Sequence, residues 1–549
     1  MYIRGEIRMR KWLKAKRLSM LLLAMTILVA AGCQSVGGLD FNQTLKNSLK
    51  TTSSESKSTI QFKLNLDEKA IKSAKDNEEL ADEELELLRL FSNVKLELHQ
   101  LQAGQTQVSV EGKLILGEEK PVSVGFTAKA DEKTLVIELE GAKQPFTFDL
   151  TGETYLEVNG FGEDEAAPTE SVDHESLTKL GFDIRDIISN YAINNLPNPK
   201  DLKVTPVSEP INGVETGLMH VQFSMDSKGL WDWAGSYLDA LIADRAGLHT
   251  MIKGILELLD SNKALLDSVN GNYEYYTGGV LDAPTTGEQS DQLTAEIEEQ
   301  LVALRDEMKQ LEKEDKEWLD AFFNEALKLD ANVYVDSSLH IRKTQYELSY
   351  APAASLEEEY ALPFTGFSFK VSTEQWNVNG DVKPAPPVVT DQAIALEEVE
   401  LMEGFDVVKL FDEDSFVYDL LKNKLHITYQ GYYGFPESFY NPPIVMPGYI
   451  TMVAVRDVAE DFGAEVTYDA KTRTITVADR GTDTKIQFQS GSDTVVVNGV
   501  KEVWPLPAIV IEGTTYVPAR KLAETLGASI EWTTFYEDGD KVLIIEREL

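Results

Sequence analysis

The sequence predicts an α+β protein: an antiparallel-sheet N-terminal domain with long amphipathic helices, followed by a small C-terminal α+β domain. Three observations predict this class. Apolar and polar residues alternate with period two in many short segments between 59 and 376, as in strands with one buried face. Two long stretches, 228–260 and 289–327, carry apolar residues at helical spacing. A strand–helix–hairpin pattern occurs at 452–468 and again at 516–532.

The first residues have the composition of an export signal. Residues 1–17 carry seven Lys or Arg against Glu6 alone, and the apolar run that follows is too short for a comfortable membrane span. The ending VAAGC at 29–33 resembles the lipobox of bacterial lipoproteins. This resemblance implies that 1–32 is a cleaved signal peptide and that Cys33 becomes the lipidated N-terminus. Met1 and Met9 both fit as translation starts.

Charge and cysteine content restrict the partners and the source of stability. The formal net charge is −41, which argues against nucleic acid because a phosphate backbone would be repelled. Cys33 is the only cysteine, so the chain has no disulfide and its stability must come from packed cores. No later segment approaches 18 uninterrupted apolar residues. We therefore expect the lipid to be the membrane attachment, on the extracytoplasmic face of the cell membrane.

The long N-terminal region divides into a tether and a domain. Residues 33–58 are polar and rich in Ser and Thr, which predicts a flexible tether. Residues 59–376 form the predicted α+β domain, in which 67–91 and 176–194 are helical in composition. Alternating, strand-like segments lie at 60–66, 94–98, 108–116, 122–126, 134–141, 144–152, 154–160, 217–226, 331–350 and 364–378.

A composition change separates this domain from the C-terminal end. Residues 377–393 form a Pro-rich linker that we expect to be extended and semi-rigid. A connecting segment, 394–440, carries a short predicted helix near 414–423 and a strand near 424–430. Residues 441–549 contain the two repeats.

The repeats share one register without a gap. In the second, Pro518 stands at the helix entrance, where a missing N–H costs nothing, and Gly527 ends the helix. Gly463 ends the helix of the first repeat in the same way. One such unit cannot bury its apolar stripe alone, so the second copy should complete a shared core. Arg456 and Arg520 occupy matched positions; a structural role, bonding carbonyls or a carboxylate, is favoured over ligand binding.

Three stretches carry a specific resemblance: VAVRDVAEDFGAEVTYDAKTRTITV, IQFQSGSDTVVVNG and TTYVPARKLAETLGASIEW. Together they resemble the copper amine oxidase N-terminal-like domain, also called a stalk domain, over about 440–549. Ala454 departs from the family pattern, which has proline there. The resemblance implies a twisted antiparallel sheet around helices. It also implies a non-catalytic spacer or adhesion module, as in surface and secreted proteins of Gram-positive spore formers such as Paenibacillus relatives and other Bacillales.

Amine oxidase activity itself is not expected. Asn272-Tyr273-Glu274 resembles the motif whose tyrosine becomes topaquinone, but Val269 stands where that motif has Ser or Thr. Copper binding in that family needs a His-x-His pair, and none of the six histidines are two residues apart. The sequence also has no Gly-x-Ser-x-Gly, His-Glu-x-x-His or phosphate loop. We therefore predict no catalytic residue, no metal ligand and no cofactor.

Two hypotheses for the function follow. The first is a non-catalytic, lipid-anchored extracytoplasmic protein that uses its stalk domain for surface presentation or for contact with the cell wall or a surface protein. The alternative is a carrier of a lipid or other apolar ligand, because the N-terminal domain loosely resembles lipoprotein folds of the LolA/LppX type. Its aromatic residues would line either a core, which is favoured, or a cavity: Phe126, Phe146, Phe148, Trp231 and Trp233. A hydrolase with an unrecognised site is a third, less favoured reading.

Overall fold

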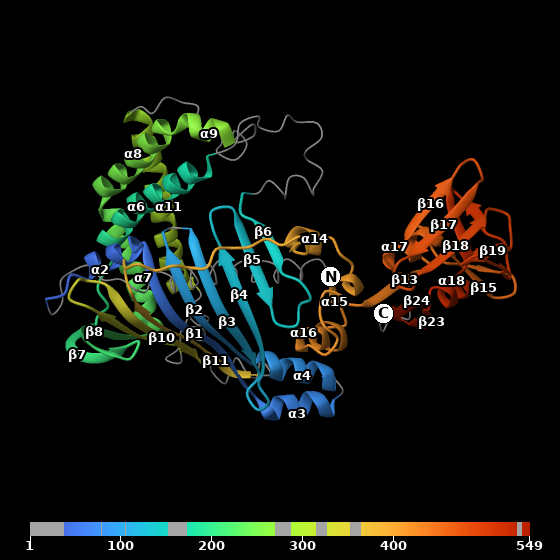
Figure 1. The fold of residues 1–549 in the computed structure, drawn as a ribbon, viewed down its shortest axis with the longest axis horizontal. Coiled ribbons are helices and arrows are strands. Elements are labelled where there is room, and N and C mark those ends of the chain that lie inside the picture. The colour runs from blue at the N-terminus through green and yellow to red at the C-terminus, as the bar shows by residue number, and fades with distance from the viewer. Residues whose placement is uncertain are drawn as a thin grey trace. The chain divides into compact units, whose positions relative to one another are not determined.

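A computed structural model shows two compact units, each described here by itself (Figure 1). The first unit comprises Met1–Glu140 and Pro145–Glu397, and the second comprises Gly141–Gln144 and Glu398–Leu549. The structure describes residues 38–77, 80–104, 106–151, 173–269, 287–314, 327–351, 364–534 and 541–549. This division corrects the predicted connecting segment 394–440, whose residues are shared between the two units.

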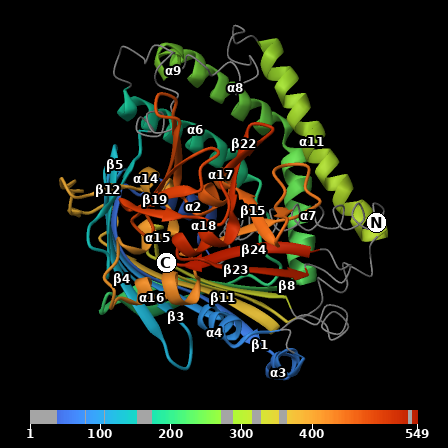
Figure 2. The ribbon, with the colours of Figure 1, turned by 90° about the vertical axis from the view of Figure 1, so that its right-hand side faces the viewer.

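The first unit is built on a twelve-stranded sheet, as the predicted α+β class requires. The strand order is β12-β6-β5-β4-β3-β2-β1-β11-β10-β9-β8-β7, and all pairs are antiparallel except β12 with β6. Figure 2 shows the sheet curving around the side that the helices occupy. The strands are β1 (Ser53–Leu66), β2 (Asn93–Ala103), β3 (Gln107–Leu116), β4 (Val122–Ala130), β5 (Thr134–Leu139), β6 (Phe146–Asp149), β7 (Lys203–Ile211), β8 (Val214–Asp226), β9 (Lys328–Val335), β10 (Ile341–Tyr350), β11 (Phe364–Trp376) and β12 (Ile394–Ala395).

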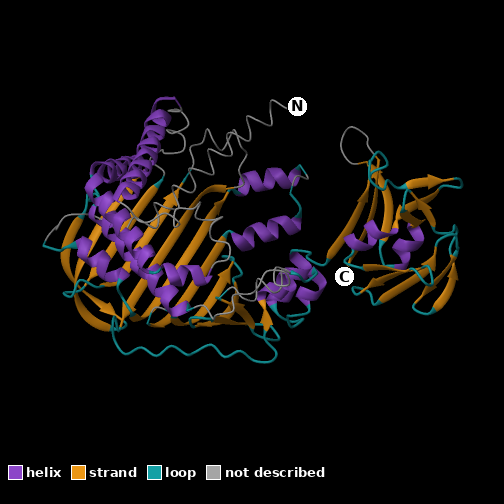
Figure 3. Ribbon diagram, turned by 90° about the horizontal axis from the view of Figure 1, so that it is seen from above, coloured by secondary structure: helices purple, strands orange, loops and turns teal. Residues whose placement is uncertain are grey.

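Most helices of the first unit gather over one part of the sheet, whereas α3 and α4 lie apart from them at the ends of the strands (Figures 1 and 3). Trp233 and Tyr237 of α7 pack with Phe223 of β8 and Val333 of β9 in a buried core that extends to β10. The helices are α2 (Phe41–Leu49), α3 (Glu68–Asp76), α4 (Asp82–Phe91), α6 (His174–Asn194), α7 (Ser227–Ala243), α8 (Arg245–Ser261), α9 (Lys263–Val269), α11 (Gly287–Glu314) and α14 (Leu396–Glu400).

The stretch 228–260, predicted as one helix, is two helices separated at Asp244. The backbone of Asp244 is not helical, and its carboxylate accepts a hydrogen bond from the N–H of Gly247 at 2.9 Å. An aspartate that bonds the N–H three residues ahead ends one helix and starts the next.

The predicted tether at 33–58 is corrected by α2 and by the start of β1. Phe41 and Leu45 of α2 are buried in the same core as Trp233, and the carboxylate of Asp40 caps this helix. β1 begins at Ser53, where its backbone pairs with β2, and from Glu55 onward it pairs with both β2 and β11. Ladder hydrogen bonds on both sides order this Ser-rich stretch, although its side chains are polar.

The Pro-rich segment 377–393 has no helix or strand, as predicted, but it does not join the two units. It connects β11 inside the sheet to β12 at the edge and crosses the strands, as Figure 1 shows. The seven strand spacings between β11 and β12 amount to roughly 33 Å, which an extended chain of this length spans easily. The segment is therefore a strap within the first unit.

The second unit contains three small sheets and the two predicted repeats. The sheets have the strand orders β13-β24-β23, β14-β15-β22-β21 and β16-β17-β18-β19-β20. The predicted strand near 424–430 is shifted: it begins at Tyr429. The elements are α15 (Gly404–Val408), α16 (Phe416–Asp419), a π-helical turn (Leu420–Lys424), β13 (Tyr429–Gly434), β14 (Ile444–Met446), β15 (Ile450–Ala454), α17 (Val455–Asp461), β16 (Glu465–Asp469), β17 (Thr474–Asp479), β18 (Thr484–Gln489), β19 (Thr494–Val497), β20 (Val500–Val503), β21 (Ile509–Ile511), β22 (Thr514–Pro518), α18 (Ala519–Thr525), β23 (Ser529–Thr534) and β24 (Lys541–Glu548).

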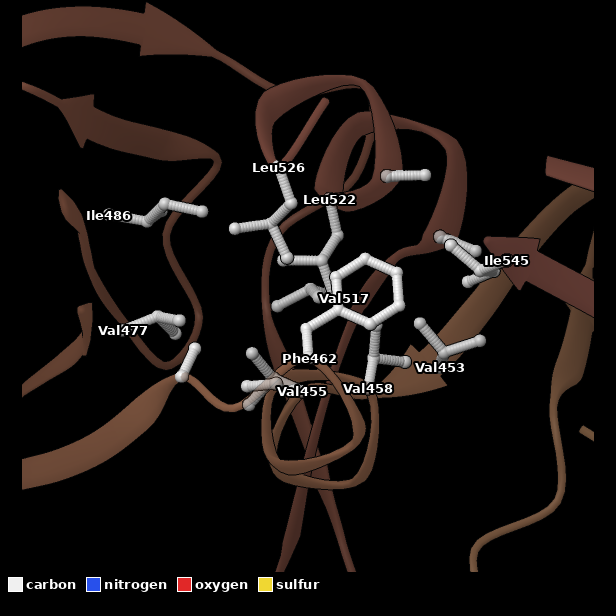
Figure 4. Close-up of a cluster of buried hydrophobic side chains, with 14 of the residues drawn as sticks. Val453, Val455, Val458, Phe462, Val477, Ile486, Val517, Leu522, Leu526 and Ile545 are labelled. Carbon is white, nitrogen blue, oxygen red and sulfur yellow. The ribbon is translucent and has the colours of Figure 1, made fainter. Parts of the chain in front are cut away.

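The repeats bury their apolar stripes against each other, as predicted. Figure 4 shows Val458 and Phe462 of the first repeat converging with Leu522 and Leu526 of the second. These four side chains are fully buried. β15 and β22, the entrance strands of the two repeats, pair antiparallel with Val453 opposite Val517. The core is therefore shared, and neither repeat has a complete core of its own.

Gly527 offers a test of the helix stop. Its φ is +71°, and a Cβ there would meet only Thr482 at 3.8 Å. Gly527→Ala should therefore lower the free energy of unfolding by about 1–2 kcal/mol through backbone strain alone. Gly527→Asn should cost clearly less, because asparagine tolerates this conformation. Urea unfolding of both variants measures the difference, and equal losses would contradict a conformational origin.

Candidate functional site

The first unit presents one uncharged face across β11 and β1–β6. In the antiparallel register, Ile60 lies opposite Leu96 and Val371, and Phe62 lies opposite Val94 and Phe369. The alternation continues without interruption from strand to strand. We call this surface the apolar face and define it by Ile60, Phe62, Leu64, Val94, Leu96, Leu98, Val110, Leu114, Val124, Phe126, Leu135, Ile137, Phe146, Phe148, Phe367, Phe369 and Val371.

Much of the apolar face remains accessible. Phe62, Phe148 and Phe369 are 36%, 39% and 36% exposed, and most of the other side chains are half-buried. Phe62 and Phe367 contact each other with ring centroids 6.1 Å apart. Seven adjacent strands span roughly 30 Å, so this surface is larger than the scattered apolar residues of an ordinary protein surface.

The described helices do not complete a core over this part of the sheet. The large core that they form with the sheet includes β8, β9 and β10. Tyr346 and Tyr350 of β10 lie at the margin of this core. The ring centroid of Tyr350 is 5.6 Å from that of Phe367 on the apolar face. Burial raises the pKa of Tyr346 to about 12, so this hydroxyl stays neutral at physiological pH.

The five aromatic residues that the sequence offers for a core or a cavity lie partly in the packed core and partly on the apolar face. Trp233 belongs to the packed core, and its indole N–H donates to the carbonyl of Pro197 at 2.8 Å. Trp231 is buried and donates to Glu312 at 2.7 Å. Phe146 is buried at the edge of the sheet, whereas Phe126 is half-buried and Phe148 is exposed on the apolar face. The two tryptophans therefore lie in packed surroundings under the helices, whereas Phe126 and Phe148 lie on the accessible part of the sheet.

The predicted arginines are both on the surface of the second unit. Arg456 pairs with Glu460 one helical turn away at 3.1 Å, with both side chains more than half exposed. Arg520 is exposed and forms no ion pair with any residue that the structure describes. Cys33 and Tyr273 lie outside the described residues.

The structural role expected of an arginine belongs to Arg547, which the sequence did not single out. Its guanidinium is 1% exposed and forms an ion pair with the fully buried Asp479, at 2.5 Å and 3.0 Å to the two carboxylate oxygens. It also donates to the carbonyls of Leu526 (2.7 Å) and Phe462 (3.2 Å) and to the side chain of Gln430 (2.8 Å).

These partners explain why the site sits between the repeats. Phe462 and Leu526 are the C-terminal caps of α17 and α18, where carbonyl groups have no helical partner and the helix dipole is negative. The guanidinium of Arg547 therefore caps the C-terminal ends of both repeat helices. The guanidinium also lies over the ring of Phe462 at 4.5 Å, which adds a cation–π contact.

The Asp479 carboxylate makes the second unit sensitive to acid. Burial by itself raises the pKa of Asp479, but hydrogen bonds from Arg547 and Thr482 outweigh it, so the pKa lies below its ordinary value of 3.8. A carboxylate whose pKa is lower in the folded state than in the unfolded state stabilises the fold at pH values above its unfolded-state pKa. This stabilisation is lost as the pH falls through the folded-state pKa. At pH values below about 4, the free energy of unfolding of this unit should therefore decrease. In Asp479→Asn this fall should be shallower, and an unchanged slope in urea titrations would contradict the assignment.

The described histidines are scattered. His220 bonds Asn332 at 2.9 Å and stacks on Tyr334, and His249 lies 3.2 Å from Asp291. Within the described residues, no group of three or more His, Cys, Asp or Glu is placed to hold a metal ion. Among the described helices, none is long and apolar enough to cross a membrane.

Comparison with known proteins identifies one domain. Residues 435–536 match the copper amine oxidase N-terminal domain, which confirms the resemblance found in the repeats. No curated protein and no solved structure matches the chain. The matched region ends before β24, so Arg547 lies beyond it although it closes the repeat core.

Proposed function

We propose that this protein is a non-catalytic, extracytoplasmic binding protein whose first unit holds a lipid or similar apolar ligand on the apolar face. The observation that carries this proposal is the continuous accessible apolar surface on seven neighbouring strands. Exposed apolar patches of more than a few hundred Å² mark interaction or ligand sites in soluble proteins. Burying an acyl chain there would gain about 0.8 kcal/mol for each methylene removed from water.

Native mass spectrometry of the full chain, recovered from the producing cells in mild detergent, tests this function. The expected result is added mass that fragments into fatty acyl species and is lost on organic extraction. The covalent lipid at Cys33 remains attached after extraction, so it is distinguishable from a bound ligand. Protein without a removable lipid, which also takes up none from vesicles, would contradict the proposal.

A second role, presentation at the cell surface, is favoured by a different observation. The VAAGC ending supplies Cys33 as a lipid attachment point, and the matched domain at 435–536 fits a stalk that contacts the cell wall or a surface protein. Labelling of cells with an alkyne fatty acid tests the anchor. The label should appear on the native chain and be absent from Cys33→Ser, which should also leave the membrane fraction. Label that persists in Cys33→Ser would contradict the anchor.

A further inference from the structure

The end of the apolar face carries an uncharged polar band on β11, β1 and β2. Ser56 lies opposite Gln375 on one side and Gln100 on the other, and Ser58 lies opposite Thr373. The hydroxyls of Ser58 and Thr373 are 2.9 Å apart. We define the polar band as these five residues, all of which are half-buried. It adjoins Ile60 and Leu98 of the apolar face directly.

The amide groups of this band are available to a ligand. Within the described residues, neither the side chain of Gln100 nor that of Gln375 makes a hydrogen bond. An amide group that is half-buried and unpaired has two donors and an acceptor to offer. A bound molecule that brings hydroxyl groups to this band would satisfy them.

The seven strands that carry the apolar face place no charge on this side of the sheet, and the guanidinium of Arg342 on the adjoining β10, which donates to the carbonyl of Gln375 at 3.0 Å, is already paired with Asp336 at 3.1 Å. On β11 and β1–β6, every described residue whose register places it with the apolar face or the polar band is uncharged. The charged residues of the same strands are on the opposite face, where four of the lysines form ion pairs: Lys63 with Glu118, Lys95 with Glu97, Lys129 with Glu138, and Lys370 with Glu347.

The absence of charge on this face favours a lipid headgroup made of hydroxyl groups over one that carries a phosphate. A phosphate removed from water needs Arg or Lys to balance its charge, and an unpaired buried anion costs several kcal/mol. The net charge of the chain, −41, adds long-range repulsion. A headgroup made of hydroxyl groups meets neither penalty and matches the donors and acceptors of the polar band.

We infer, on the basis of the proposed function, that the ligand is an uncharged lipid whose acyl chains lie on the apolar face and whose hydroxyl-bearing head, a sugar or glycerol, binds the polar band. Anionic phospholipids bind less well because the face supplies no counter-charge for their phosphate. The ligand is therefore selected by the absence of cations as much as by the presence of amides.

A competition experiment tests this selectivity. The delipidated full chain is incubated with vesicles that contain equal amounts of diglucosyl diacylglycerol and phosphatidylglycerol with identical acyl chains, and bound lipid is quantified by mass spectrometry. The glycolipid should be preferred by at least about tenfold. Equal binding, or a preference for phosphatidylglycerol, would overturn the inference and leave the proposed function intact. Binding of neither lipid would contradict both.

A charge placed on the band sharpens the test. Gln100→Lys should shift the preference toward phosphatidylglycerol by tenfold or more, because it supplies the missing cation. Thr59→Lys is the matched control, since Thr59 neighbours the band on β1 but lies on the opposite face; its preference should equal that of the native chain. A shift of the same size in both variants would show a general charge effect and overturn the role of the polar band.

Discussion

Replacing Arg547 by methionine should destabilise the second unit by about 3–5 kcal/mol, the cost of leaving one partner of a buried ion pair uncompensated. The fully buried Asp479 would lose both of its guanidinium contacts. The carbonyl of Leu526 would lose the guanidinium that donates to it, and the carbonyl of Phe462 would keep only the hydrogen bond from the side chain of Gln430. Methionine keeps most of the apolar volume, so a cavity contributes little to the expected loss.

Hydrogen exchange measured during urea unfolding separates the second unit from the first within the full chain. In Arg547→Met, the amides of α17 and α18 should exchange at much lower urea than in the native chain. Arg520→Met is the matched control, because Arg520 is exposed, and it should stay within about 0.5 kcal/mol of the native chain. If Arg547→Met lowers the free energy of unfolding of the second unit by less than about 1 kcal/mol, Arg547 does not hold the two repeats together as described.

Phe62→Glu should reduce lipid binding by at least a hundredfold, which corresponds to roughly 3 kcal/mol. The carboxylate would stand in the middle of the apolar face, opposite Val94 and Phe369, where bound acyl chains would strip it of water. The side chain of Phe62 is 36% exposed. Folding should therefore be affected far less than binding, because the charge stays hydrated until a ligand arrives.

Gln61→Glu is the matched control for this variant, since it adds the same charge one residue away on the opposite face. Lipid occupancy by native mass spectrometry should be normal in Gln61→Glu and nearly absent in Phe62→Glu. Circular dichroism of both variants checks that the sheet is retained. Normal occupancy in folded Phe62→Glu would show that ligand does not bind at this face.

The sequence predicts most strands of the first unit because their apolar side chains alternate with period two on one face, but it does not predict β7 or β12. It fails where backbone pairing decides the structure: Glu55–Ser58 are ordered in β1 by strands on both sides, and such pairing leaves no signal in the hydropathy pattern. It also fails at Asp244, where one capping carboxylate divides a continuous apolar stripe. The apolar face itself follows from alternation, but its extent depends on register and on where the helices end.

The Arg547 site shows what sequence reading missed and why. Its partners Asp479 and Gln430 are 68 and 117 residues away in the chain, so no local spacing connects them. Arg456 and Arg520 repeat in one register, which makes them candidates by sequence, yet both are exposed to solvent. One signal was available: in β24, Arg547 has the same parity as Leu543 and Ile545, which places it on the inward face of the strand.

Photocrosslinking of a bound lipid tests the central claim most directly. A lipid with a diazirine in its acyl chain would be loaded onto the full chain, irradiated, and its adducts mapped by peptide mass spectrometry. The account predicts adducts concentrated on peptides of β11 and β1–β6, at residues of the apolar face such as Phe62, Phe126 and Phe369. Adducts confined to the second unit or to the polar side of the sheet, or none at all, would contradict it.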